Sequence, residues 1–147
     1  ANRIVALFAG CGTFTLPLAR HAHLHAVEGD AAMLGALDQG WRHAQGLKPV
    51  TTEARDLFHR PLLADELSRF DAALLDPPRA GAEAQIAQIA AARLPRLVYI
   101  SCNPVSFARD ARYLSSHGYE IGEVQVVDQF RWSAHVELVA AFTLKSA

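Results

Sequence analysis

The chain has 147 residues, of which 51% are apolar and 20% charged, with 9 Gly and 7 Pro, and this composition excludes a disordered or collagen-like segment. The 14 Lys and Arg against 15 Asp and Glu give a formal net charge of -1, which excludes the strong positive field of a protein that binds nucleic acid unaided. Two cysteines exclude a disulfide framework, and no apolar run reaches the about 18 residues that span a bilayer, so we expect a cytoplasmic protein without a membrane partner.

Apolar runs bounded by turn residues alternate with helical patterns along the chain, which predicts βαβ units and a mostly parallel sheet. The predicted strands cover residues 3–8, 24–28, 49–54, 71–76, 96–101, 119–127 and 136–144. The predicted helices cover the segment that ends near residue 20, and residues 30–45, 62–68, 83–93 and 104–117. Because only a loop joins the last two strands, they should pair antiparallel. The sequence thus predicts one α/β domain over residues 1–147, with about seven strands and a terminal antiparallel hairpin.

Right-handed crossovers place the carboxyl ends of parallel strands at one edge of a sheet, where ligands bind. Gly10 and Gly12 follow the first strand, where glycine permits a tight turn and a close approach of backbone N–H groups to a ligand. Glu28 ends the next strand, 16 positions after Gly12, and is placed to accept hydrogen bonds from ribose hydroxyls. Thr15 replaces the third glycine of a dinucleotide fingerprint, which disfavours a dehydrogenase. The pattern predicts an adenosine-type cofactor site, with a plain strand-to-helix corner as the alternative.

Two aspartates follow the third and fourth predicted strands. Asp56 is placed to bond the exocyclic amine of an adenine, or else it begins a helix at the surface. Asp76 precedes Pro77 and Pro78, which fix a rigid extended loop beside the predicted cofactor, with a purely structural turn as the alternative.

A thiol and a carboxylate complete the set of candidate residues. Cys102 ends the fifth strand next to the start of a predicted helix, which suits a nucleophile. The alternative is a half-buried structural cysteine. We interpret Cys11 as such a structural cysteine. Glu137 lies in the otherwise apolar run VELVAAF and should be partly desolvated, which suits a general base, whereas a surface glutamate is the alternative.

Two further patterns have a structural interpretation. The helical spacing of Phe107, Asp110 and Leu114 predicts an amphipathic helix that packs on the sheet. The alternating histidines His21 and His23, followed by another at position 25, have no complementary carboxylate or cysteine cluster, so we expect no metal site.

Five segments, LFAGCGTFTLPLA, VEGD, LDPPRAG, YISCNP and DQFRWSAHVE, occur in this order over nearly the whole chain. In this series the sequence resembles the S-adenosylmethionine-dependent RNA uridine-5 methyltransferases, which make 5-methyluridine in tRNA and ribosomal RNA. Arg79 after the Asp-Pro-Pro run favours uridine over cytosine or an amino group as the target. The resemblance implies a Rossmann-like class I methyltransferase fold and S-adenosylmethionine as the cofactor.

The resemblance also implies roles for individual residues. Cys102 would be the nucleophile and Glu137 the base. The cofactor site would be lined by Phe8, Gly10, Gly12, Thr13 and Glu28, with Asp56 near the adenine and Asp76 near the reactive end. The sequence departs from the usual family pattern at Ala6, which replaces an Asp, and at Thr13, which replaces a common Asn.

The partners follow from the same resemblance. Whole members of that family have an amino-terminal RNA-binding domain, and Ala1 leads almost directly into a strand, so we expect a carboxyl-terminal catalytic domain of a longer protein. An rRNA or tRNA substrate would be held mostly by the upstream part, which agrees with the net charge near zero. A methyltransferase-fold domain that binds the cofactor but is inactive alone, or acts on another substrate, is the alternative.

Overall fold

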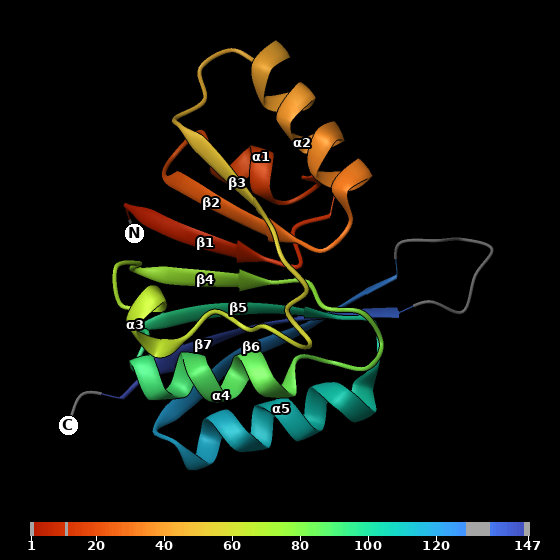
Figure 1. The fold of residues 1–147 in the computed structure, drawn as a ribbon. Coiled ribbons are helices and arrows are strands. Elements are labelled where there is room, and N and C mark those ends of the chain that lie inside the picture. Colours follow the sequence, from red (N-terminus) through yellow and green to blue (C-terminus); the bar gives the residue numbers. More distant parts are fainter. Residues whose placement is uncertain (1, 11, 129–135, 146–147) are drawn as a thin grey trace.

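The computed structural model describes residues 2–10, 12–128 and 136–145, and in them seven strands form one sheet (Figure 1). The strands are β1 (Arg3–Leu7), β2 (His23–Glu28), β3 (Val50–Ala54), β4 (Ala72–Leu75), β5 (Arg96–Ser101), β6 (Tyr119–Asp128) and β7 (Val136–Leu144). Their order across the sheet is β3-β2-β1-β4-β5-β7-β6. Cys11 and the segment 129–135, which holds most of DQFRWSAHVE, lie outside the described residues.

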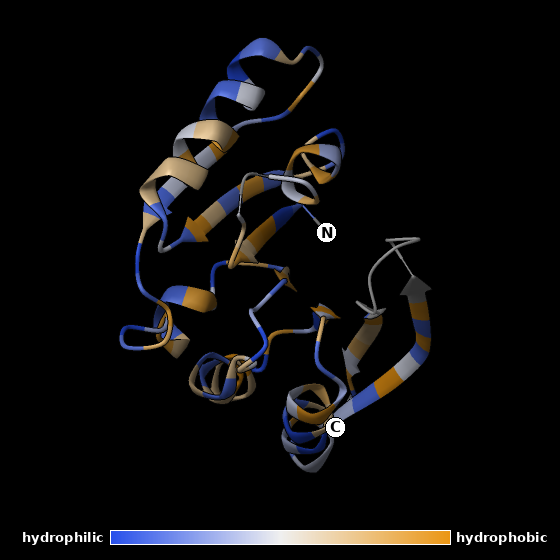
Figure 2. Cartoon of the chain, turned by 90° about the vertical axis from the view of Figure 1, so that its right-hand side faces the viewer, coloured by the Kyte–Doolittle hydropathy of each residue, from blue (hydrophilic) through white to orange (hydrophobic). Residues whose placement is uncertain are grey.

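The first five strands run parallel, and β7 pairs antiparallel with both β5 and β6. This confirms the predicted mostly parallel sheet with a terminal antiparallel hairpin. Figure 2 looks onto the edge at which β1 to β5 end. Because β7 runs the opposite way, its first residues lie at the same edge as the last residues of β5, where Ser101 pairs with Leu138.

The helices are α1 (Thr15–Leu18), α2 (Ala31–His43), α3 (Ala64–Leu67), α4 (Glu83–Ala92) and α5 (Pro104–Ser116). Among the described residues, none of these helices is long and apolar enough to cross a bilayer. α1 ends at Leu18, before the predicted residue 20, because the amides of Arg20 and His21 bond to carbonyls only three residues back.

Alternate residues of the strands enter two cores on opposite faces of the sheet. Leu7 faces the first core with α3, α4 and α5, whereas its neighbour Ala6 faces the second core with α1 and α2. Figure 1 shows α4 and α5 side by side along the first face. The largest fully buried side chains of the first core include Leu75, Tyr99, Tyr119 and Phe142. Helices thus pack on both faces of the sheet, and the ends of the strands remain uncovered by the described helices.

Side-chain caps start two helices at the open edge of the sheet. Asp30 accepts hydrogen bonds from the amides of Ala32 and Met33 at 2.9 and 3.2 Å, which starts α2. Asn103 accepts from the amide of Val105 at 3.0 Å, and proline occupies the first turn of α5. Such a cap contributes about 1 kcal/mol to stability and leaves no freedom in where the helix begins.

Candidate active site

A hollow of about 380 Å³ lies at the carboxyl ends of β1, β2 and β4. Its walls are Phe8, Gly10, Glu28, Gly29, Met33, Asp56, Leu57, Phe58, Asp76, Pro77 and Pro78. Five residues that the sequence analysis selected are therefore brought together from four separate loops. They meet because parallel strands end at one edge of the sheet.

Glu28 ends β2 and holds the turn after β1 against the start of α2. Its Oε1 accepts a hydrogen bond from the amide of Gly10 and its Oε2 one from the amide of Asp30, both at 2.9 Å. A carboxylate oxygen can accept a second hydrogen bond, so Glu28 keeps acceptor capacity toward the hollow. The hydrogen bonds from the two backbone amides fix the position of the Glu28 carboxylate in the absence of a ligand.

Phe8 and Phe58 form an aromatic wall of the hollow. Their ring centroids are 5.4 Å apart at an angle of 55°. Phe8 has a φ of 58°, a left-handed conformation that costs a bulky residue about 1 to 3 kcal/mol. This conformation turns the chain out of β1 just before Gly10, whose amide reaches Glu28. The strain therefore accompanies the turn that forms the site.

Gly12 and Thr13 are not among the residues that line the hollow. A Cβ at Gly12 would lie 3.0 Å from Leu37 and 3.1 Å from Leu16, and φ is +97°, so glycine is needed there for packing and for the turn. Thr13 is exposed in the turn that precedes α1. The structure thus brings only Gly10 of the two glycines to the hollow.

Asp56 both lines the hollow and forms a surface turn, so the two interpretations of this residue are compatible. It accepts hydrogen bonds from the amide of Phe58 at 3.0 Å and from the ring Nδ1 of His59 at 2.7 Å. The His59 bond is the main reason why the pKa of Asp56 lies below its ordinary value. Asp56 is therefore an ionised acceptor at the rim of the hollow.

Asp76 follows β4 and is half-buried, with its amide bonded to the carbonyl of Leu7 at 3.2 Å. Burial and, after it, the negative charges of Glu137 and Glu28 together raise the pKa of Asp76 to about 6. The three carboxylates therefore repel one another when all are ionised. A positively charged ligand at this point would relieve their repulsion.

Cys102 and Glu137 lie at two adjoining strand ends. Each is one residue beyond the paired positions Ser101 and Leu138 of β5 and β7. The Cys102 thiol is half-buried. The Oε2 atom of Glu137 is buried and has no hydrogen-bond partner within residues 2–10, 12–128 and 136–145. Such buried acceptors without a partner are rare, and this one can accept a hydrogen bond or a proton.

Two residues of the hollow and a buried carboxylate on α5 could not be assigned to the site from the sequence. Met33 and Leu57 come from irregular or helix-start positions, where no periodic pattern could indicate them. Asp110 is on the helix face that was predicted to pack on the sheet, and it is indeed 1% exposed. A carboxylate on an apolar face was a usable signal, because a buried charge needs partners.

Comparison with known proteins gives consistent matches. The family model for tRNA (Uracil-5-)-methyltransferase matches residues 49–144. An uncharacterized RNA methyltransferase of Brucella melitensis is 54% identical over 143 residues, which are 97% of this chain and 34% of that protein. The 23S rRNA (uracil(1939)-C(5))-methyltransferase of Hahella chejuensis is 42% identical over 148 residues, covering 95% of this chain and 32% of that protein. The chain spans about a third of the length of these relatives.

Solved structures agree with the sequence matches. The Pyrococcus abyssi tRNA (uracil-54, C5)-methyltransferase, in complex with S-adenosyl-L-homocysteine, has a TM-score of 0.82 at 27% identity and covers 97% of this chain and 34% of that one. The Synechocystis magnesium protoporphyrin IX methyltransferase has a TM-score of 0.68 at 18% identity, covering 95% of this chain and 69% of that one. These likenesses confirm the Rossmann-like class I methyltransferase fold.

Proposed function

Because the chain belongs to the tRNA (uracil-5-)-methyltransferase family, we propose that it is the catalytic domain with which a longer enzyme methylates carbon 5 of a uridine in RNA. The main support within the structure is the position of Cys102 and Glu137, at adjoining strand ends on the edge that also holds Asp76. The Hahella chejuensis relative is named for uracil in 23S rRNA and the Pyrococcus abyssi enzyme for uracil in tRNA, which supports a uridine in RNA as the substrate class.

The hollow fits S-adenosylmethionine. Glu28 is a fixed acceptor for the ribose hydroxyls, and Asp56 is an acceptor for the adenine amine beside the apolar wall of Phe8 and Phe58. Asp76 supplies negative charge for the cationic end of the molecule. The volume of about 380 Å³ lies within the range of about 300 to 1,000 Å³ that is usual for small-ligand sites. When bound, this cofactor supplies a methyl group on an electron-poor sulfonium.

Cys102 activates the uracil ring of the substrate. Carbon 5 of uracil is a weak nucleophile until the thiolate adds to carbon 6. The new bond between sulfur and carbon 6 moves the electrons of the 5,6 double bond onto carbon 5 and its neighbouring carbonyl. This enolate is the species that accepts a methyl group. The position of Cys102, directly after β5 and in front of α5, holds the sulfur at the sheet edge.

Glu137 reverses the addition. Once carbon 5 has both a methyl group and a proton, Glu137 takes that proton, the 5,6 double bond forms again, and the thiolate of Cys102 leaves. The buried Oε2 atom has no hydrogen-bond donor among the residues that the structure describes, so it can accept the proton from carbon 5. The protonated acid then returns its proton to solvent.

The target base has to leave the stack of a helix to reach a half-buried thiol. A net charge of -1 supplies little general attraction for phosphates. We therefore assign most of the RNA contact to the part of the longer enzyme that this chain does not include.

A covalent trap tests the mechanism. RNA with 5-fluorouridine has no removable proton at carbon 5, so the adduct should accumulate with S-adenosylmethionine in this chain and in the longer protein. We expect a protein–RNA band on denaturing gels and a modified peptide that contains Cys102. Cys102→Ser should give neither. An adduct in that variant, or methyl transfer to another nucleotide, would contradict the proposal, and cofactor binding without any transfer by the longer protein would favour the binding-only alternative.

A further inference from the structure

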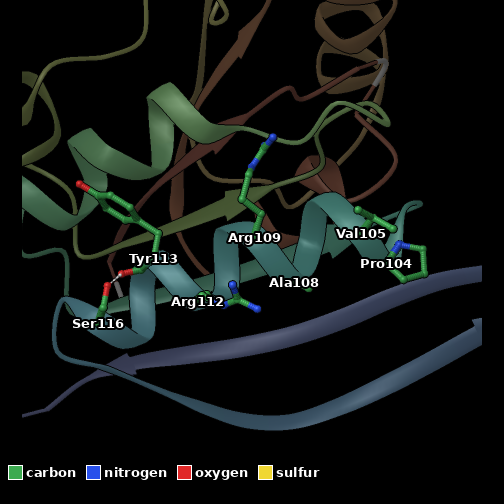
Figure 3. Close-up of a pocket in the computed structure, with 7 residues that line it drawn as sticks. All are labelled: Pro104, Val105, Ala108, Arg109, Arg112, Tyr113 and Ser116. Atoms are coloured by element: carbon green, nitrogen blue, oxygen red, sulfur yellow. Dashed lines mark hydrogen bonds between the residues drawn. The ribbon is translucent and has the colours of Figure 1, made fainter.

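The loop of residues 79–82, which joins Pro78 to α4, lies directly on α5 and is held there by side chains. The Nδ2 of Asn103 and the Oγ of Ser106 both donate to the carbonyl of Arg79, at 2.9 and 2.8 Å. The Nη2 of Arg109 donates to the carbonyl of Ala80 at 2.9 Å. Figure 3 shows Arg109 extending from α5 toward this loop.

Asp110 is the buried centre of this contact, with 1% of its surface exposed. Its Oδ2 accepts from the amide of Ala82 at 2.9 Å and from the hydroxyl of Tyr99 at 2.5 Å. Burial and the bond to Asp110 raise the pKa of Tyr99 far above its ordinary value, so the phenol stays a donor. One carboxylate therefore joins the loop, β5 and α5.

Gly81 allows the loop to come this close. It is buried with a φ of +80°, and a Cβ there would lie 2.7 Å from Nη2 of Arg109 and 2.9 Å from Oδ2 of Asp110. It would also lie 3.0 Å from Cβ of Ser106. A side chain at this position therefore requires the loop, Asp110 or Arg109 to move, which disturbs the contact.

The contact joins an element that leads from the cofactor hollow, the 79–82 loop, to an element that follows the proposed nucleophile, α5. The loop continues directly from Asp76 and the two prolines that form one wall of the hollow. α5 begins two residues after Cys102, and its cap Asn103 is itself bonded to the loop. The contact between the loop and α5 thus acts together with the pairing of β4 and β5 on the separation between the thiol and this wall of the hollow.

We propose that Asp110 is a positioning residue, which together with Gly81 holds the 79–82 loop on α5 and so sets the thiol of Cys102 at the correct distance from the cofactor wall. The inference rests on the proposed function. Reacting atoms must approach to about 3 to 3.5 Å, and a misplacement of about 1 Å can cost about 100-fold in rate.

Two glycine variants isolate the contact. Gly46 has a φ of +77°, close to that of Gly81, but a Cβ there would meet nothing within 4 Å. Gly81→Ala and Gly46→Ala therefore add similar backbone strain, and only Gly81→Ala disturbs the contact between the loop and α5. We expect kcat at saturating S-adenosylmethionine and RNA to fall about 10- to 100-fold in Gly81→Ala and to stay within about twofold in Gly46→Ala. The Kd for the cofactor should change by less than about threefold in both, because Glu28 and Gly10 are untouched.

A second pair of variants approaches the contact from α5. Asp110→Asn keeps the shape, but its single acceptor oxygen cannot serve both the Ala82 and Tyr99 donors at Oδ2 and the Arg109 donor at Oδ1, and Gln85→Leu is the control. Gln85 is also 1% exposed and makes two hydrogen bonds, with the amide and the carbonyl of Leu62 at 2.9 and 3.0 Å. A merely structural role would lower the melting temperature and kcat together in both variants. We expect both melting temperatures to fall, and kcat to fall about 10-fold or more only in Asp110→Asn.

Hydrogen exchange supplies a readout that does not depend on turnover. The amide of Ala82 should exchange about 10-fold faster in Asp110→Asn than in the unaltered protein or in Gln85→Leu. Unchanged exchange at Ala82, or kcat values of both variants within about twofold of their controls, would overturn the positioning role and leave the proposed function intact. Absence of methyl transfer to carbon 5 by the unaltered longer protein would remove the proposed function and this inference with it.

Discussion

The edge of the sheet has two halves that differ in how their polar groups are satisfied. In the cofactor half, at the ends of β1 and β2, both oxygens of Glu28 are already bonded to backbone amides of the chain. In the transfer half, at the ends of β4, β5 and β7, one oxygen of Glu137 is buried without a partner among the described residues, and Asp76 has a raised pKa. The half that we propose to bind the cofactor therefore has its acceptor fixed in advance, whereas the half that we propose to react holds carboxylates in unfavourable surroundings.

The two halves also differ in how they are supported. The cofactor half is held by direct hydrogen bonds between neighbouring strand ends, such as the bond between the Gly10 amide and Glu28. The transfer half depends on α5, whose buried Asp110 bonds to a loop that is 28 residues away in the sequence. Variants in each half should therefore separate binding from chemistry, and the predictions below test that separation.

The largest effect is expected for Glu137→Gln. An amide cannot take the proton from carbon 5, so turnover should fall about 10²- to 10⁴-fold, as for loss of a general base. The covalent adduct with ordinary uridine RNA should then persist, while the affinity for S-adenosylmethionine stays the same because Glu28 is intact. Single-turnover kinetics and denaturing gels measure the first two quantities, and calorimetry measures the third.

A matched control for this variant lies on the neighbouring strand. Glu120 is an exposed strand glutamate that pairs with Thr143 at the far end of the hairpin. Glu120→Gln should leave the rate unchanged. A normal rate in Glu137→Gln would show that Glu137 is not the general base. The unpaired oxygen of Glu137 would then not explain how the transfer half differs from the cofactor half.

Glu28→Ala should have the next largest effect, on binding. It removes a ribose acceptor and leaves the amides of Gly10 and Asp30 without their partner. Hydrogen bonds to charged groups are worth about 1.5 to 3 kcal/mol, which predicts S-adenosylmethionine affinity about 10- to 100-fold weaker in calorimetry. The rate at which iodoacetamide modifies Cys102 in the absence of cofactor should not change, because the transfer half is separately supported.

Asp38→Ala supplies the control for Glu28→Ala. Asp38 lies on α2 and bonds to Arg42 at the surface, at 2.9 Å. Its removal should leave affinity unaltered. Equal affinities of the two variants would show that the hollow binds the cofactor without help from Glu28.

The sequence sufficed for the fold because its signals are local. Each apolar run and its turn residues predict one strand, and the alternation with helices predicts a parallel sheet. The same logic placed Gly10, Glu28, Asp56 and Asp76 at one edge, since parallel strands end together, and the family resemblance added Phe8. The ends of the elements differ from the prediction by one or two residues, as at α1, which ends at Leu18 instead of near residue 20, and at α3, which covers Ala64–Leu67 instead of residues 62–68.

What could not be predicted depends on residues that are distant in sequence. The glycine pattern does not show whether a ligand or a side chain packs against a given glycine. At Gly12 it is the side chain of Leu37 from α2. Periodicity indicates the face on which Asp110 lies but not its partners, Tyr99 and the loop amide of Ala82. Phe58 lines the hollow only because an irregular segment returns to Phe8.

The smallest effect is expected where the two halves meet, at Asp76. Its pKa of about 6 lies above the ordinary 3.8, mainly through burial, so the folded chain binds more protons than the unfolded chain between about pH 4 and 6. Stability contributed by this group is therefore lost as pH rises through that window. Asp76→Asn should raise the free energy of unfolding by about 1 kcal/mol at pH 7, after allowance for solvent screening, and should change little at pH 4.

Denaturant unfolding at the two pH values measures this difference, and Asp71→Asn gives a control of opposite sign. Asp71 accepts from the amides of Asn2 and Arg3, and these bonds lower its pKa, so its replacement should destabilise the chain at pH 7. In the Glu137→Gln background the gain from Asp76→Asn should shrink, and in Glu28→Ala it should shrink less, because Glu137 raises the pKa of Asp76 more than Glu28 does. An equal gain in all three backgrounds would mean that Asp76 responds to burial alone and that the two halves are electrostatically independent.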